Sequence, residues 1–129
     1  MNTKTLMTFS SLFLALAGVF TLFAPDVLLS ALGVAATAQL SVLVQLLGAL
    51  YFSFALMNWT AKDSAIGGIY ARPVSLANFS HFFAGTLLLV KYLFSNEFDL
   101  PILLVSILYA SFAIVFYWLV FRATGLKAQ

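Results

Sequence analysis

The segment Pro101–Phe121 reads PILLVSILYASFAIVFYWLVF. It contains no Asp, Glu, Lys or Arg, and its apolar residues follow one another without the alternation of polar and apolar positions that is typical of a strand in a membrane barrel. A helix needs about 20 mostly apolar residues to cross the hydrocarbon layer of a bilayer. The segment therefore predicts a transmembrane helix.

Three further stretches have the same character, namely Thr5–Phe23, Gln39–Thr60 and Ser75–Phe94. The first could be mistaken for a secretion signal, but its apolar run is long for a signal core, so we interpret it as a retained helix. Together the four stretches predict an all-α fold, a single four-helix transmembrane domain over residues 1–129. We expect a left-handed bundle with up-down-up-down topology.

The composition limits the classes of protein that fit. Of the 129 residues, 64% are hydrophobic and 8% are charged, whereas a soluble domain usually carries about 25% charged residues. The formal charge of +2 leaves nucleic-acid binding without an electrostatic footprint. The chain has no cysteine and one histidine, which excludes disulfides, thiolate metal sites and a haem held between two histidines of one chain. We expect no cofactor and no bound metal.

The breaks between the predicted helices contain turn and cap residues. Pro25 ends the first helix, because proline disfavours helix at the residue before it. The segment Asp26–Leu32 predicts a short apolar-faced helix at the membrane interface, ended by Gly33. Asp99 can cap the last helix, and Pro101 falls in its first turn, where the missing N–H costs little.

Basic residues predict the orientation, because lysine and arginine concentrate in cytoplasmic loops. With four crossings, one side of the membrane holds all but one of the 6 basic residues, namely Lys4, Lys62, Arg72, Arg122 and Lys127. We therefore expect both termini and the loop 61–74 on the cytoplasmic side of a cell inner membrane.

Four polar residues are candidates for a site in the inner leaflet. Asn78 and His81 share one face of the third predicted helix, Asn58 ends the second, and Arg72 lies in the loop between them. If these two helices pack as an antiparallel pair, the four side chains can converge. The cluster is then a pocket for an anionic headgroup, a quinone-like ring or a proton, or else a set of interhelical hydrogen bonds that holds the helix register. The second interpretation is favoured.

Gln45 lies near the middle of the second predicted helix, where a lipid-facing amide would be unsatisfied. We expect it to face the other helices and to bond to a hydroxyl, that of Ser10, Ser11, Ser106 or Tyr109.

Lys91 lies about one turn inside the outer end of the third predicted helix. Its stem can extend to the interface, where we expect charge pairing with Glu97, Asp99 or Asp26. A substrate-facing charge is the alternative.

Weaker patterns point to packing or to ligands. Small residues that favour close helix contact are Gly18, Gly48 and the pairs Ser11-x-x-x-Ala15 and Ala49-x-x-x-Ser53. Gly67-Gly68 followed by Arg72 predicts a flexible turn or a phosphate-binding concavity. An aromatic stripe on the last helix, interpreted as packing or lipid contact or else as the wall of a pigment or quinone groove, consists of Tyr109, Phe112 and Phe116.

The stretch GVFTLFAPDVLLSALG (18–33), followed by QLLGALYFSFALMNW (45–59), resembles small four-helix bacterial membrane proteins of the DoxX-like kind. The resemblance covers about the first 60 residues and rests on Gly18, Pro25, Gly33 and Gly48. It implies a four-helix membrane fold and, as for some members, a place in quinone-linked membrane oxidoreductases. The charged signature residues of that group are not clear in this chain, so the resemblance implies no catalytic residue.

No Ser–His–Asp set, HExxH motif or metal-ligand spacing occurs in the sequence. We therefore expect a non-enzymatic accessory or structural subunit of a membrane complex, which associates with itself or with other subunits in the lipid bilayer. One alternative is a small-solute or ion transporter or channel assembled as an oligomer. Another is a quinone-linked redox subunit or a lipid-binding enzyme.

Overall fold

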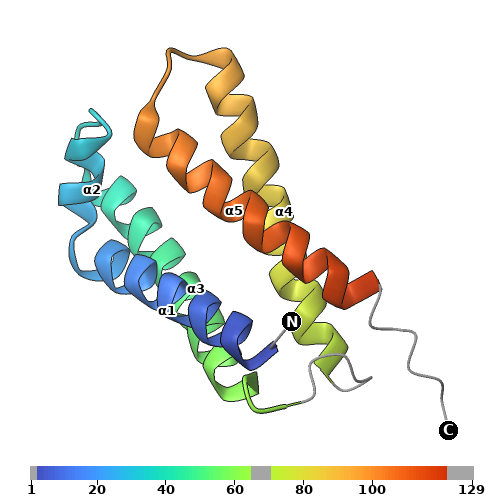
Figure 1. Ribbon diagram of the computed structural model, residues 1–129. Coiled ribbons are helices and arrows are strands. Elements are labelled where there is room, and N and C mark those ends of the chain that lie inside the picture. Colours follow the sequence, from blue (N-terminus) through green and yellow to red (C-terminus); the bar gives the residue numbers. More distant parts are fainter. Residues whose placement is uncertain (1–2, 65–70, 122–129) are drawn as a thin grey trace, which may run out of the picture. The chain divides into compact units, whose positions relative to one another are not determined.

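The computed structural model describes residues 3–64 and 71–121, and these residues contain five α-helices and no strand (Figure 1). The helices are α1 (Thr3–Phe23), α2 (Pro25–Ala31), α3 (Ala38–Ala61), α4 (Arg72–Ser95) and α5 (Leu100–Phe121). All except α2 are long and apolar enough to cross a membrane. The expected all-α fold with four candidate membrane spans is confirmed.

The ends of α4 and α5 follow from local chemistry. α4 begins at Arg72 instead of Ser75, because Pro73 lies in its first turn, where no backbone N–H is needed. At the start of α5, the Asp99 Oδ1 accepts a hydrogen bond from the N–H of Ile102 at 3.3 Å. The predicted cap at Asp99 is therefore confirmed.

The short helix α2 ends at a glycine, as the sequence predicts. The N–H of Gly33 donates to the Ser30 carbonyl at 3.0 Å, and the N–H of Val34 donates to the Leu29 carbonyl at 2.9 Å. This pair of bonds is the Schellman ending of a helix, which needs a left-handed residue. Gly33 provides it with a φ of 70°, a conformation that glycine adopts without strain.

The chain divides into two compact units, Met1–Asp63 and Ser64–Gln129, which we call the N-terminal and C-terminal units and describe separately. The N-terminal unit contains α1, α2 and α3, and the C-terminal unit contains α4 and α5. Within each unit the two long helices lie side by side (Figure 1).

In the N-terminal unit, α1 and α3 are antiparallel and approach closely. The buried residues of α1 follow the i, i+3, i+4, i+7 pattern of one helix face, namely Met7, Ser10, Ser11, Leu14, Gly18 and Thr21. A Cβ on Gly48 would lie 2.8 Å from the Leu22 nitrogen and 3.0 Å from the Gly18 oxygen. These contacts are with backbone atoms, so the helix approach requires glycine, and the predicted packing role of Gly18 and Gly48 is confirmed.

In the C-terminal unit, aromatic rings hold α4 against α5. The fully buried Phe82 stacks on Phe112 with ring centroids 4.7 Å apart, and it also contacts Phe116 and Tyr109. Gly85 leaves the space for the Tyr109 ring, because a Cβ there would lie 2.6 Å from ring carbons. The predicted aromatic stripe of α5 is therefore a packing surface for α4.

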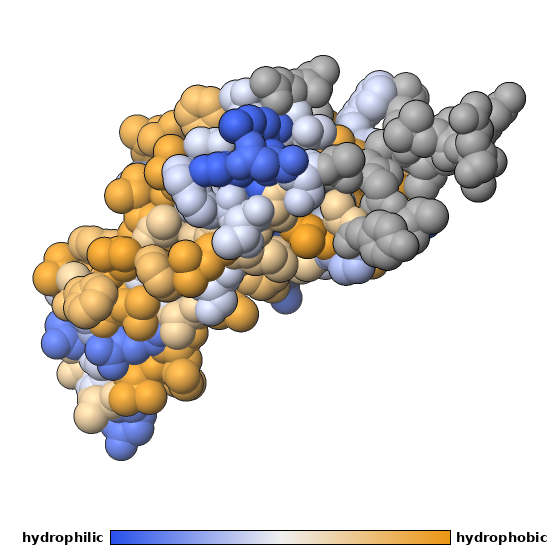
Figure 2. Space-filling view, turned by 90° about the horizontal axis from the view of Figure 1, so that it is seen from below, coloured by the Kyte–Doolittle hydropathy of each residue, from blue (hydrophilic) through white to orange (hydrophobic). Residues whose placement is uncertain are grey.

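Apolar side chains remain on the surface. On the face drawn in Figure 2, orange and tan atoms cover most of the described surface, and blue atoms gather in a few places. Leu16 is 74% exposed, Phe23 83% and Leu88 69%. A surface of this kind suits hydrocarbon and not water, which agrees with four helices long and apolar enough to cross a membrane.

Candidate functional site

Polar contacts connect α1 and α2 to α3 along the N-terminal unit. We call this series the polar ladder, and its contacts are Lys4–Asp63, Ser10–Asn58, Ser11–Ala55, Leu22–Gln45 and Asp26–Ser41. Residue numbers that rise along α1 pair with numbers that fall along α3. The ladder therefore shows that the two helices are antiparallel.

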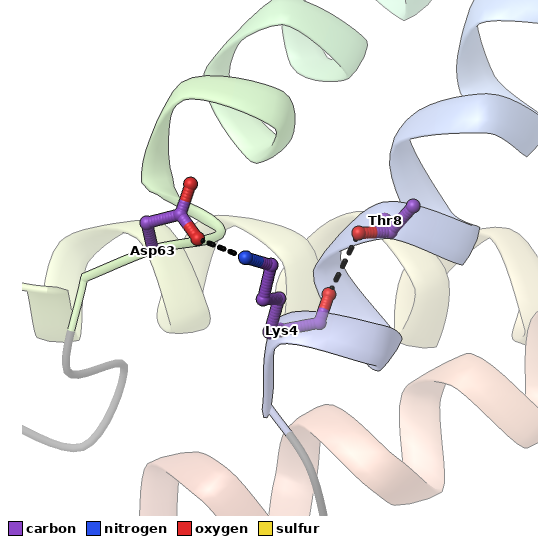
Figure 3. Close-up of polar contacts among 3 residues, drawn as sticks. All are labelled: Lys4, Thr8 and Asp63. Carbon is purple, nitrogen blue, oxygen red and sulfur yellow. Dashed lines mark hydrogen bonds and ion pairs between the residues drawn. The ribbon is translucent and has the colours of Figure 1, made fainter.

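One end of the ladder is the ion pair between Lys4 and Asp63, with an Nζ–Oδ1 distance of 2.7 Å (Figure 3). The hydrogen bond from Lys4 is the main reason why the pKa of Asp63 lies below its usual 3.8. The Thr8 hydroxyl donates to the Lys4 carbonyl one turn further along α1. Beside the pair, the Lys62 ammonium lies 3.0 Å above the centre of the Trp59 ring.

Asn58 is the buried amide of the ladder. Its side chain is fully buried, and its Nδ2 donates to the Ser10 Oγ at 3.0 Å. Ser10 donates in turn to the Met7 carbonyl at 3.1 Å. One turn away, the Ser11 hydroxyl donates across the helix interface to the Ala55 carbonyl at 2.8 Å. These bonds fix the register of α1 against α3.

Gln45 has a different partner from the hydroxyls expected from the sequence. Its Nε2 donates to the Leu22 carbonyl at 3.0 Å. Leu22 lies in the last turn of α1, where carbonyls have no partner within the helix. Gln45 therefore satisfies the end of a neighbouring helix.

The ladder ends where α2 meets α3. The Ser41 hydroxyl donates to the Asp26 Oδ1 at 2.6 Å, a short bond as expected for a charged acceptor. Asp26 also lies in the first turn of α2, where the helix dipole favours a negative charge.

In the C-terminal unit, His81 and Tyr109 form a polar contact between α4 and α5. The His81 Nε2 and the Tyr109 hydroxyl oxygen lie 3.5 Å apart, and the ring centroids are 5.6 Å apart. His81 is half-buried and Tyr109 is buried. The sequence placed each residue on an inward face but did not pair them.

Asn78 and Arg72 lie on the same helix as His81. Asn78 is fully buried, and its Nδ2 donates to the Val74 carbonyl at 2.9 Å, one turn back. Arg72 is the first residue of α4. Asn58 belongs to the other unit, so the convergence of all four residues stays a prediction.

An open apolar groove of ≈ 380 Å³ lies between α4 and α5, lined by Phe79, Phe83, Ala113, Ile114 and Tyr117. Phe79 contacts Tyr117 with ring centroids 5.9 Å apart, so the groove has an aromatic wall. Its lining residues are uncharged, so the groove could accommodate an acyl chain or a ring by apolar contact but offers no charged group to a ligand.

Lys91 lies near the other end of α4. Among residues 3–64 and 71–121, no carboxylate oxygen lies within 4.0 Å of its ammonium, and Asp99 caps α5 instead. The structure does not bring Lys91, Glu97 and Asp99 together as an ion pair.

Some predicted features lie outside the described residues, namely Gly67-Gly68, Arg122 and Lys127. Within the described ranges, no group of three His, Cys, Asp or Glu residues could hold a metal ion.

Comparison of the chain with protein-family models, with curated proteins and with solved structures finds no match. The resemblance to DoxX-like proteins therefore stays a prediction, and the functional argument depends on the geometry of the chain.

Proposed function

We propose that this chain is a non-enzymatic accessory or structural subunit of a membrane protein complex. The observation that carries the proposal is that polar side chains inside the predicted spans of the N-terminal unit form hydrogen bonds within that unit. In the polar ladder, the Asn58 and Gln45 amides and the Ser11 hydroxyl bond to groups of their own unit. Groups held in this way stabilise a helical hairpin and offer little to a substrate.

The surface of the chain supports association inside the membrane. Ala49 and Ser53 lie on an exposed side of α3, and the Ser53 hydroxyl donates to the Ala49 carbonyl one turn back along its own helix. Small residues at this spacing allow the backbone of another helix to approach. A second copy of the chain or another subunit would fit this face.

Extraction in a mild detergent or in polymer-bounded nanodiscs, followed by crosslinking and size analysis, tests the proposal. We expect a homo-oligomer or a co-purifying subunit. Replacing Ala49 and Ser53 with Leu should reduce the assembled fraction, whereas Leu43→Phe, which adds bulk at an exposed position on another side of the same helix, serves as a control. A wild-type chain that stays monomeric and alone under these conditions would refute the proposal.

We also propose an inner-membrane location with cytoplasmic termini and four crossings. The Lys4–Asp63 pair supports it, because Lys4 and the neighbouring Lys62 then lie at one end of the N-terminal unit. Positive charges gathered at one end favour the cytoplasmic side.

The absence of cysteine makes this topology testable with single-cysteine variants. Cysteines introduced at Ala36 and Glu97 should react with a membrane-impermeant maleimide added to intact cells. A cysteine introduced at Ser64 should react only after lysis. The reverse pattern would contradict the orientation, and labelling of all three positions in intact cells would contradict the four crossings.

A second candidate function, a quinone-linked or lipid-binding role, is favoured by the His81–Tyr109 contact. It places the imidazole Nε2 of His81 and the phenol oxygen of Tyr109 3.5 Å apart between α4 and α5. This role predicts that solvent extracts of the purified protein contain a quinone or another ring-bearing lipid, and that His81→Leu lowers its amount. Extracts that contain no such molecule would contradict this second role, and the proposal of an accessory or structural subunit would remain.

A further inference from the structure

The last two turns of α4 carry a mixed polar and apolar face. Leu88, Lys91, Tyr92, Ser95 and Asn96 follow at the i, i+3, i+4, i+7 and i+8 spacing, which places them on one side of a helix. The same residues line an open pocket of ≈ 270 Å³.

Three polar side chains of this face, Lys91, Tyr92 and Ser95, are unused within the described part of the chain. The Lys91 ammonium has no ion-pair partner there, and the Tyr92 and Ser95 hydroxyls make no hydrogen bond there. Ser106 and Ser111 on α5 differ, because each donates to the carbonyl four residues earlier. The pocket thus holds one positive charge and two hydroxyl donors that remain available.

The end of α4 also limits the repulsion that an anion would meet there. The last carbonyls of a helix carry a partial negative charge. The Asn96 Nδ2 donates to the Tyr92 carbonyl at 2.9 Å and satisfies one of them. A phosphate beside Lys91 would therefore meet a cation and a capped helix end.

The order of residues along α4 matches the polarity of a lipid. Lys91 lies four residues before the last residue, Ser95, which is about 6 Å along the axis. Its stem can carry the ammonium to the level of lipid phosphates. Leu88 lies one turn deeper and is 69% exposed, where it offers an apolar contact to an acyl chain. An unpaired cation at this depth is costly, which favours a lipid anion as its counterion.

We infer that this face of α4 binds an anionic glycerophospholipid, with the phosphodiester at Lys91, Tyr92 and Ser95 and an acyl chain along Leu88. The inference depends on α4 crossing the membrane, and it does not depend on the accessory role or on the orientation proposed above.

Native mass spectrometry of the full-length protein in detergent tests the site. The protein is titrated separately with phosphatidylglycerol and with phosphatidylcholine, and the ratio of the two affinities is measured in each variant. We expect Lys91→Gln to lower the preference for phosphatidylglycerol about fivefold, the ratio that corresponds to about 1 kcal/mol for one basic residue near an anionic surface. Lys91→Arg should retain the preference, and Ser95→Ala should lower it by a smaller factor.

Lys62→Gln is the matched control, because Lys62 is an interfacial lysine at the end of another helix and its ammonium contacts Trp59. We expect this variant to keep the wild-type preference. The inference would be overturned by an unchanged preference in Lys91→Gln, or by an equal loss in Lys62→Gln. It would also be overturned if soluble glycerol phosphate bound as tightly as the lipid, because the site would then recognise free phosphate. Circular dichroism of each variant checks that the helices are intact.

Discussion

Asp63 is an exposed carboxylate whose ionisation depends on one neighbour. The hydrogen bond from Lys4 lowers its pKa most, and the charges of Lys4 and Lys62 lower it further, while desolvation opposes them. Both side chains of the pair are about 60% exposed (61% and 62%). Solvent screening therefore keeps the contribution of the pair to the free energy of unfolding small.

We expect Lys4→Gln to raise the pKa of Asp63 towards 3.8, and Lys62→Gln to raise it less. The carboxyl ¹³C shift of Asp63, followed by NMR titration in micelles, measures both values. Because the folded-state pKa is lowered, the stabilisation is present above the unfolded value of 3.8 and is lost as the pH falls through the folded value. An Asp63 pKa that is identical in wild type and Lys4→Gln would show that the pair does not form.

Asn58 differs from Asp63 because its amide is fully buried. In a bilayer, no water competes with the hydrogen bond between Asn58 and Ser10. Its net contribution to the free energy of unfolding is still modest, because the polar groups also find hydrogen-bond partners in the unfolded chain within the membrane. We expect a double-mutant cycle of Asn58→Leu and Ser10→Ala to give a coupling free energy of about 0.5–1 kcal/mol.

Unfolding of the four cycle proteins in mixed micelles, followed by circular dichroism, measures this coupling. Ser111→Ala replaces Ser10→Ala in the control cycle, because Ser111 bonds within α5 in the other unit. A coupling indistinguishable from that of the control would mean that the bond between Asn58 and Ser10 does not stabilise the fold.

The α1–α3 pair depends on backbone approach at Gly18 and Gly48. A Cβ on Gly48 meets backbone atoms of Leu22 and Gly18, which cannot move aside as a flexible side chain would. We expect Gly48→Val to lower the free energy of unfolding by about 1–3 kcal/mol, as overpacking does in a close-packed interface.

Leu47→Val tests the same helix one position earlier, where the side chain is exposed and lies outside the face of Ala49 and Ser53, and it should have little effect. Thermal unfolding of the two variants in the same detergent compares them directly. Equal stability of Gly48→Val and Leu47→Val would argue against the close approach of α1 and α3.

The two long-helix pairs are held by different interactions. α1 and α3 combine glycine contacts with the polar ladder, whereas α4 and α5 pack through the rings around Phe82. Both kinds of helix contact can hold helices together in lipid. Burial from water does not drive helix association there, so close packing and hydrogen bonds must do so.

The chain as a whole consists of two compact units, each with its own buried residues. Gly48→Val disturbs the contact of α1 with α3, and Gly85→Val disturbs the contact of α4 with the Tyr109 ring. Because the two substitutions share no packing partner in these contacts, we expect their effects on the free energy of unfolding to add within about 0.5 kcal/mol. Denaturant unfolding of the single and double variants measures the sum, and a larger deviation would show that the units are energetically coupled.

Much of the local structure could be predicted from the sequence. The four spans, the short helix before Gly33 and the cap at Asp99 were predicted within a few residues. The exception is the start of α4, because residues 72–74 were assigned to the loop 61–74 but belong to the first turn of the helix. The partner of Gln45 was not predictable, because the Leu22 acceptor is a backbone carbonyl, which has no residue-type signature.

The length and apolar character of four segments determined that the chain has four helices long enough to cross a membrane, because a backbone in hydrocarbon must satisfy its own hydrogen bonds. The tertiary structure decided which groups meet, such as Ser10 with Asn58 and His81 with Tyr109. It also showed that Lys91 has no carboxylate beside it in the described part of the chain. The physical reason is that a helix forms through interactions between residues one turn apart in the sequence. These contacts instead join residues that are far apart in the sequence, so they depend on how two helices pack against each other.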